Sequence, residues 1–468
     1  MSLVWKYVQI LLPVLLLTGC GPGYRRTIEP EIQNVHTITK QHTGFDLDGW
    51  DTHGLLTEEE VQQGLSIEAA LQNAILTAPE LYVNFEELGI AKADLVQAGF
   101  FRNPEVAALF QGVNSSDPKA TQLYIDVVAS MNISDFWQIP LRKKVARDEL
   151  EIKTIDALRL IVETAADARL SYYTYLYETT QIKTTEKILD TVQNLRTTAE
   201  QNYITDYVSD YDLFVADATI MQWEIKKLDL EQSLHAAALD LRNFIGLELL
   251  PVSIPLTSSW ESLLRPLPDK QALFAYAEHN NPALQIANLK IAQAHHQQEL
   301  ARSKTFDNVT FGLEFTRDNT GTKYIGPAIG FDLPVFDQQQ AQIERAQRQE
   351  KKLRRELSNM LANYSQDIFS AHKTVTNLQK KIEFYKTKIL PSARTALEHA
   401  QKHVGNLKLN FSFFINNQIN LLQQEYDLNR DYLALAQAFN KLEKAIGGAI
   451  PYDLTPHAPN SSSSGTIK

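Results

Sequence analysis

The sequence predicts a mainly α-helical protein in which β-hairpins interrupt long helices. Two runs of alternating apolar and polar residues surround a short polar turn at 318–322. Long stretches with apolar residues three and four positions apart lie on both sides of this hairpin. The same order of elements occurs earlier in the chain, about 200 residues away. Together these observations predict a duplicated unit of helix, β-hairpin, long helix and shorter helix.

Residues 1–19 are predicted to be a lipoprotein signal peptide. The apolar run from Ile10 to Leu17 is too short for a transmembrane helix and is typical of a cleaved secretion signal. It ends in Leu17-Thr18-Gly19-Cys20, which resembles the bacterial lipobox and implies that Cys20 becomes the lipidated first residue. Gly21 then favours sorting to the outer membrane by the rule for such lipoproteins. An ordinary signal peptide followed by a chance cysteine is the alternative.

Composition excludes several classes of function. The formal net charge of −11 and the lack of a basic cluster argue against nucleic acid as a partner. Cys20 is the only cysteine, which excludes a disulfide framework or a cysteine-based metal site within one chain. His399 and His403 lie four residues apart without the HExxH pattern, so no metal site is expected. No nucleophile elbow or phosphate loop occurs, so we expect no enzyme activity and no cofactor beyond a lipid on Cys20.

The first unit is assigned to residues 66–250, after a lipid-anchored and extended arm at 20–65. Its first helix begins at the capping residue Ser66 and continues to about residue 101. Two strands are predicted at about 105–133, and the second of them alternates clearly. A very long helix over about 141–202 and a shorter one over about 209–245 complete the unit.

The second unit is assigned to residues 268–448, between a linker at 251–267 and a disordered tail at 449–468. Its strands are predicted at about 307–334, where Val309, Phe311, Leu313 and Phe315 alternate with polar residues. Strands of about ten residues are long enough to cross a bilayer in a tilted barrel. Roughly sixty helical residues span about 90 Å, so the long helices must pack in an elongated bundle or tube.

Short motifs recur in the two units. Ala78-Pro79-Glu80-Leu81 corresponds to Asn281-Pro282-Ala283-Leu284, and Ile245-Gly246 corresponds to Ile446-Gly447. With the lipobox, this element order resembles the TolC-like outer-membrane efflux channel family, including the outer membrane factor lipoproteins of tripartite efflux systems. The resemblance covers residues 66–448. Its most specific points are Asn281-Pro282 with Leu284, the passage from Gly330 to Asp337, and the Val404-Gly405 turn followed by Leu421-Leu422-Gln423.

The resemblance implies a trimer in which each chain gives four strands to one twelve-stranded barrel, with the helices forming a periplasmic tube. If the mature chain crosses a membrane, it is expected to do so as a barrel, because no apolar run of about twenty residues follows the signal peptide. Aromatic residues near the strand ends are candidates for an interfacial girdle, and ordinary core packing is the alternative. They are Phe136, Trp137, Phe331 and Phe336, with Phe100, Phe101 and Phe306 nearby.

The resemblance also implies a closed periplasmic tip formed by two helix–helix turns, near 203–206 and 404–407. A narrow acidic ring at such a tip would favour cations. The candidate tip and gate residues are Asp206, Asp210, Asp212, Gly405 and Asn416. Each aspartate has a solvated or helix-capping role as the alternative, and Asn416 stands where the family often has an acid.

The function implied by the resemblance is a passive duct from the periplasm to the exterior. Its expected partners are two further copies of the chain, outer-membrane lipid, a periplasmic adaptor of the membrane fusion protein class and an inner-membrane pump. The expected location is the bacterial outer membrane, with a lipid anchor and extension into the periplasm. A lipid-anchored periplasmic coiled-coil scaffold or adaptor is the alternative. A lipid-anchored envelope enzyme would need a polar constellation that the sequence lacks.

Overall fold

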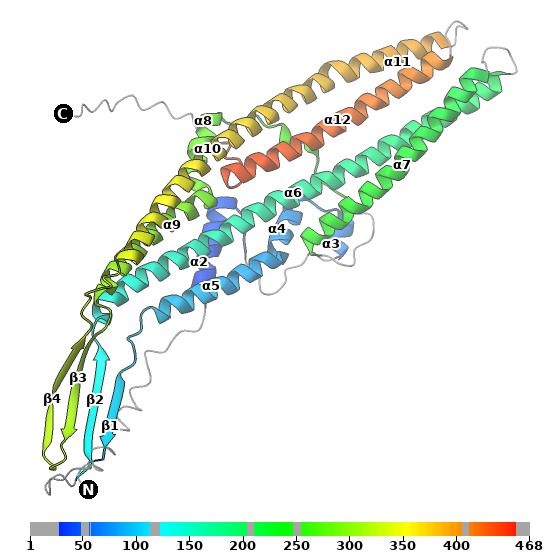
Figure 1. Ribbon diagram of the computed structural model, residues 1–468. Coiled ribbons are helices and arrows are strands. Elements are labelled where there is room, and N and C mark those ends of the chain that lie inside the picture. The colour runs from blue at the N-terminus through cyan, green and yellow to red at the C-terminus, as the bar shows by residue number, and fades with distance from the viewer. Residues whose placement is uncertain are drawn as a thin grey trace, which may run out of the picture.

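The protein is an elongated helical body with a small sheet at one end, as Figure 1 shows. The predicted mainly helical fold with paired hairpins is confirmed. Among the described helices, none combines the length and hydropathy needed to span a membrane. The computed structural model describes residues 28–47, 56, 58–112, 122–203, 210–246, 254–404 and 411–454.

The region expected to be an extended arm contains two helices, α2 (Glu29–Thr43) and α3 (Glu58–Gln63), so that expectation is wrong there. Ile32 and Val35 of α2 are each only 1% exposed and pack in one cluster with residues of α4, α5 and α6. The apolar stripe is short and is followed by Gly44 in the left-handed conformation, which ends α2. Tertiary packing therefore stabilises a helix whose own periodicity is weak.

The helix predicted to run without a break from residue 66 to about 101 is two helices, α4 (Ile67–Thr77) and α5 (Pro79–Gln97). Ser66 caps α4 as expected, accepting a hydrogen bond from Ala69 N at 3.1 Å. Ala78 is extended, with ψ of 113°, because the ring of the following proline excludes the helical conformation. Pro79 then occupies the start of α5, where its missing N–H costs nothing.

A similar break lies between α8 (Lys270–Asn280) and α9 (Pro282–Ser303). Here Asn281 is the capping residue, and its side-chain oxygen accepts from Ala283 N at 2.9 Å. Its side-chain amide donates to Ala445 O at 2.9 Å, which ties the end of α12 (Phe411–Ile446) to this corner.

The longest of the described helices is α6 (Asp135–Tyr203), and it pairs with the antiparallel helix α7 (Asp210–Ile245). Its 69 residues span about 100 Å, so α6 extends from the sheet to the far end of the body (Figure 1). It begins six residues before the predicted start near residue 141, because Pro140 lies close enough to the N-terminus to be tolerated.

The second long helical stretch is interrupted. It comprises α10 (Gln340–Phe384), the π-helical turn η3 (Tyr385–Ile389) and α11 (Leu390–Val404), and α12 (Phe411–Ile446) packs beside it. Pro391 has no N–H to donate to the preceding turn, and the backbone accommodates this loss with the wider π-helical spacing. Apolar periodicity alone does not show such a break.

A stack of aromatic rings joins α6 to α12. Trp260, in the short 3₁₀ helix η1 (Trp260–Leu264), lies between Tyr173 of α6 and Tyr432 of α12, with ring centroids 5.3 and 5.2 Å apart. Tyr172 donates to the carbonyl of Leu65 at 2.9 Å. We call the Tyr173–Trp260–Tyr432 stack the aromatic clasp.

The predicted tail at 449–468 begins inside the core. Ile450 packs in the same buried cluster as Tyr173 and Tyr432, and residues 455–468 lie outside the described chain.

The sheet contains β1 (Glu105–Gln111), β2 (Tyr124–Asn132), β3 (Val309–Arg317) and β4 (Lys323–Phe331), paired antiparallel in that order. Pairing of β2 with β3 joins hairpins that are about 180 residues apart in sequence. An added Cβ at Gly312 would lie 2.3 Å from the carbonyl of Ala129, so this approach requires glycine.

The β3–β4 turn is held by the carboxylate of Asp318. It accepts hydrogen bonds from the hydroxyl of Thr320 at 2.7 Å and from the backbone N–H of Thr322 at 2.8 Å. The Thr320 hydroxyl, with backbone N–H groups of the turn, lowers the pKa of Asp318. Gly321 has φ of 92° and completes the turn.

Substitution of Gly447 by alanine should destabilise the protein by about 1–3 kcal/mol. Gly447 has φ of +84°, and an added Cβ would lie 2.5 Å from Cα of Asn281. The measurement is the apparent unfolding temperature of the purified protein. Gly448→Ala is the matched control, because nothing lies within 4 Å of its added Cβ. Equal unfolding temperatures for the two variants would contradict a close approach of α12 to Asn281.

Candidate functional site: a two-faced sheet and its junction with the helices

One face of the sheet is apolar across all four strands. The pairing places Phe311 opposite Met131 on one side and Ile329 on the other, so these side chains share a face. Many of the large side chains on this face are exposed, including Ile325 at 78%, Val106 at 70% and Ile329 at 68%. We call this surface the apolar face. Its residues are Val106, Ala108, Phe110, Ile125, Val127, Ala129, Met131, Val309, Phe311, Leu313, Phe315, Ile325, Pro327, Ile329 and Phe331.

The opposite face carries most of the polar residues of the strands, together with three glycines. The exceptions are Arg317 and Lys323, which lie at the β3–β4 turn end of the apolar face. Glu105, Asp126 and Glu314 lie on it, and the hydroxyl of Thr316 donates to Asp126 Oδ1 at 3.1 Å. Such a sheet separates an apolar medium on one side from water on the other. An exposed apolar surface of this extent marks a contact with lipid or protein.

The junction between sheet and helices is held by Asp135, whose side chain is 0% exposed. The backbone N–H of Arg102 donates to its Oδ2 at 2.6 Å, and Arg102 Nε donates to its Oδ1 at 3.1 Å. Arg142 donates to Oδ1 as well, at 3.0 Å. Arg102 also donates to the carbonyl of Asp307 at 3.1 Å. The segment before β1 and the start of α6 are therefore fixed to one carboxylate, and Arg102 connects the segment before β3 to them.

The aromatic residues predicted as a girdle gather at this junction. Phe136 and Trp137 lie in the first turn of α6, and Phe331 ends β4. Phe336, in the segment between β4 and α10, is 92% exposed. Phe101 packs edge to face on Phe136 with centroids 5.2 Å apart. Their common position beside the sheet fits the expected girdle, and their interfacial role stays a prediction.

The described candidate tip residues lie at the end of the body opposite the sheet. Asp210 is the first residue of α7 and is exposed, Asp212 follows in the same helix, and Asn416 is an exposed residue of α12. Asp206 and Gly405 lie outside the described residues, as do the two predicted turns for the most part. The ends of α6, α7, α11 and α12 nevertheless lie far from the sheet (Figure 1).

Within the described part of the chain, no three metal-ligating side chains come together. The adjacent histidines of α9 pair with carboxylates instead: His296 Nδ1 lies 2.6 Å from Asp148, and His295 Nδ1 lies 3.6 Å from Glu350.

Sequence reasoning missed the junction network. Ser134-Asp135 before a long helix resembles an ordinary capping pair, which hides the burial of the carboxylate. Arg102 is 33 residues away in sequence, and Asp307 is 205 residues from Arg102, so no local pattern connects them.

No family model and no curated protein matches the chain. Solved structures do match. A crystal structure of CusC, in work on folding and transmembrane channel formation, has a TM-score of 0.67 at 14% identity, covering 92% of this chain and 100% of CusC. The outer membrane protein VceC of Vibrio cholerae has a TM-score of 0.64 at 16% identity, covering 84% and 100%. The open-state MtrE outer membrane channel of Neisseria gonorrhoeae has a TM-score of 0.65 at 14% identity, covering 83% and 90%.

The chain therefore has the fold of these outer-membrane channels over most of its length and most of theirs. The resemblance to the TolC-like channel family is confirmed at the level of fold. Identities of 14–16% carry the fold and not the residues of a particular site.

Replacement of Asp135 by alanine should destabilise the protein by about 3–5 kcal/mol, because it leaves Arg102 and Arg142 partly buried without their shared carboxylate. The measurement is the apparent unfolding temperature, together with the rate of proteolysis at the sheet–helix junction. Asp307→Ala is the matched control, since its carboxylate is half exposed and lies 3.5 Å from Arg102. If the two variants were equally stable, Asp135 would not be what holds the junction.

Proposed function

We propose that this chain is the outer-membrane channel of a tripartite efflux or type I export system, a passive duct to the cell exterior. The observation that carries the proposal is the two-faced sheet at the end of a long helical body with an outer-membrane channel fold. The apolar face is suited to lipid and the polar face to a water-filled passage. The exposed aromatic residues at the junction suit the level of the lipid headgroups.

A single chain does not complete such a duct. The sheet ends in β1 and β4, and both edge strands leave backbone groups without a strand partner in one chain. Four strands cannot enclose a usable pore, whereas three chains would supply twelve. The helices also form a layer with two edges. α5 and α7 contact α6, and α6 contacts α9 and α12. α9 and α12 then contact α10, and α12 contacts α11. A homotrimer would close the sheet and the helical layer together.

The two halves of the chain support this arrangement. A pair of helices, a hairpin, a long helical stretch and a final helix follow one another from residue 67 to 245 and again from 270 to 446. We infer that the halves are a duplicated unit, so that a trimer has six similar segments around its axis. Such near-symmetry suits a tube.

In this mechanism the protein supplies a path and the pump supplies the energy. A periplasmic adaptor would connect the helical end of the body to an inner-membrane pump. Opening would separate the ends of α6, α7, α11 and α12, where Asp210 and Asn416 lie. A lipid on Cys20 would anchor the mature chain in the outer membrane, and the intact mass of that chain tests this.

A lipid-anchored coiled-coil scaffold is the second candidate considered. Adaptors of that class carry a lipoyl-like β segment between their helices. In the described residues, the named strands all belong to one sheet with an exposed apolar face. This sheet favours the duct.

The decisive measurement of the duct is single-channel conductance in planar bilayers, with Cys20 retained. We expect small, stable currents from trimers and an increase of about twofold or more for Asp210→Ala, which removes charge at the tip. Asp240→Ala, an exposed position near the other end of α7, should leave the conductance unchanged. Protein shown to be folded, trimeric and inserted that forms no pore would remove the channel proposal.

Substitution of Leu313 by arginine should reduce insertion into lipid by about 2–4 kcal/mol, because it places a charge on the apolar face near the middle of β3. The measurement is the fraction of heat-modifiable, folded protein in liposomes as a function of urea. Val128→Arg is the matched control, since it adds the same charge on the opposite face beside Glu314. Equal loss of insertion in both variants would show that the apolar face does not contact lipid.

A further inference from the structure

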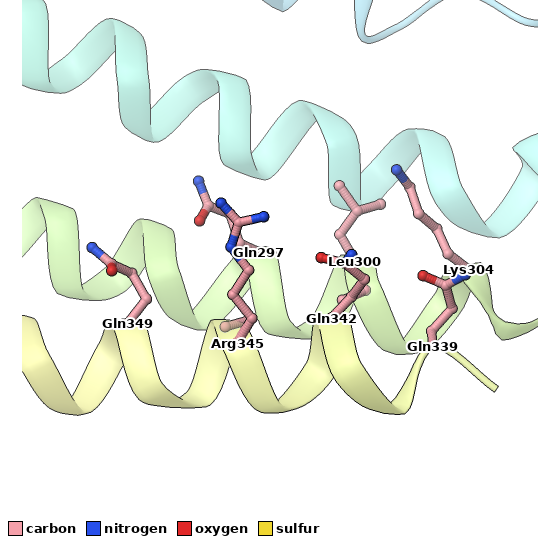
Figure 2. A pocket seen from close by; sticks show the side chains of 9 residues that line it. Gln297, Leu300, Lys304, Gln339, Gln342, Arg345 and Gln349 are labelled. Atoms are coloured by element: carbon pink, nitrogen blue, oxygen red, sulfur yellow. The ribbon is translucent and has the colours of Figure 1, made fainter. Parts of the chain in front are cut away.

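A hollow with a volume of about 660 Å³ lies between α9 and α10, close to the sheet. Figure 2 shows its side chains projecting from the two helices into the same space. Two cations line it, Lys304 from the end of α9 and Arg345 from α10. The other polar side chains in its wall are the amides of Gln297, Gln339, Gln342 and Gln349.

The two cations of this hollow are not neutralised. In the described part of the chain, neither Lys304 nor Arg345 forms an ion pair. Nearby arginines on α10 do, since Arg348 contacts Glu344 at 2.6 Å and Arg354 contacts Glu350 at 2.8 Å. No carboxylate is among the residues that line the hollow. Its positive potential is therefore available to a ligand.

The donors around the hollow fit an oxyanion. A guanidinium group presents a planar pair of N–H donors that suits phosphate or carboxylate, and an ammonium group adds a compact charge. Each glutamine amide has two further N–H donors. A cation would meet two positive charges there.

The position of the hollow connects it to the duct. It shares one face of α10 with a larger hollow, of about 980 Å³, between α10 and α12. Another face of α10 is covered: His372 lies 3.0 Å from the carbonyl of Pro268, and Gln379 donates to the carbonyl of Leu263 at 2.9 Å. The face with the two hollows is therefore one of the faces of α10 that can line a passage, and the face with Glu344 and Arg348 is exposed as well.

We infer that the α9–α10 hollow binds an oxyanion, namely a phosphate, sulfate or carboxylate group. The group would belong to a solute in transit or to a lipid headgroup at the level of the junction. Only the first source rests on the duct function proposed above. In a trimer the site would occur three times and would place six positive charges around the passage below the acidic polar face of the sheet.

The first test is titration calorimetry of the full-length protein in non-ionic detergent at low salt, with inorganic pyrophosphate as the probe. The double substitution Lys304→Gln and Arg345→Gln should weaken binding about tenfold or more. The control is Lys373→Gln with Arg147→Gln, which removes one exposed lysine and one exposed arginine that line neither hollow. It should change the Kd less than about twofold. Equal weakening by both pairs, or no binding by the unmodified protein, would overturn the inference.

The second test distinguishes the two sources. If the group belongs to a lipid, the unmodified protein should retain phospholipid phosphorus through purification, and the Lys304 and Arg345 double variant should lose it. If it belongs to a solute, phosphorus should be equal in both proteins. The reversal potential in a KCl gradient should then shift towards cation selectivity in the double variant only. Equal phosphorus and equal reversal potentials in both proteins would overturn a role for the hollow in the membrane or the passage.

The experiments distinguish failure of the anion-site inference from failure of the proposed channel function. Pores formed by the unmodified protein without pyrophosphate binding would leave the channel intact and remove the anion site. Pyrophosphate binding without pores would keep the site and remove the channel.

Discussion

The buried carboxylate of Asp135 is the contact on which the arrangement of sheet and helices depends. Two arginines and one backbone N–H donate to it from segments that precede β1 and begin α6. Arg102 extends the network to the segment before β3. A charge removed from water this completely is stable only when its partners are held in place, so each of these segments fixes the others. The sheet is therefore held at a fixed angle to the helical body, and its apolar face lies at a fixed distance from the helices.

The hairpins and long helices could be predicted from the sequence because their signals are local and repeated. Alternation in β3 and β4 specifies both a strand and the face that each side chain occupies, since a slip of one residue would exchange the faces. The apolar stripes of α6 and α10 specify helices without specifying breaks. Pro79 and Pro391 show two outcomes of proline: the first begins a new helix, and the second leaves a π-helical turn inside a continuous one. Helix α2 was missed because it depends on partners from α4, α5 and α6.

Some residues of the candidate site could likewise be predicted from local sequence patterns, and others could not. Phe136 and Phe331 could be placed near the sheet–helix junction because each follows or ends a predicted strand. The junction network and the α9–α10 hollow could not, because their members come from distant parts of the chain. Lys304 and Arg345 are 41 residues apart, and a whole hairpin lies between them. Hydrophobic periodicity predicts which side chains share one face of a helix or strand. It does not predict which two faces, from distant parts of the chain, come into contact in the folded protein.

The aromatic clasp has a mechanical consequence. Trp260 is held between Tyr173 of α6 and Tyr432 of α12, so both helices are tied at the same level of the body. Beyond Tyr173, α6 continues for thirty residues to Tyr203, a lever arm of about 45 Å. A rotation of about 10° around this fulcrum would carry the helix end through about 8 Å. Small repacking around Trp260 would thus be amplified into a larger displacement at the opposite end from the sheet, where Ile188 and Val192 of α6 pack on α7 and α12 and would carry these helices along.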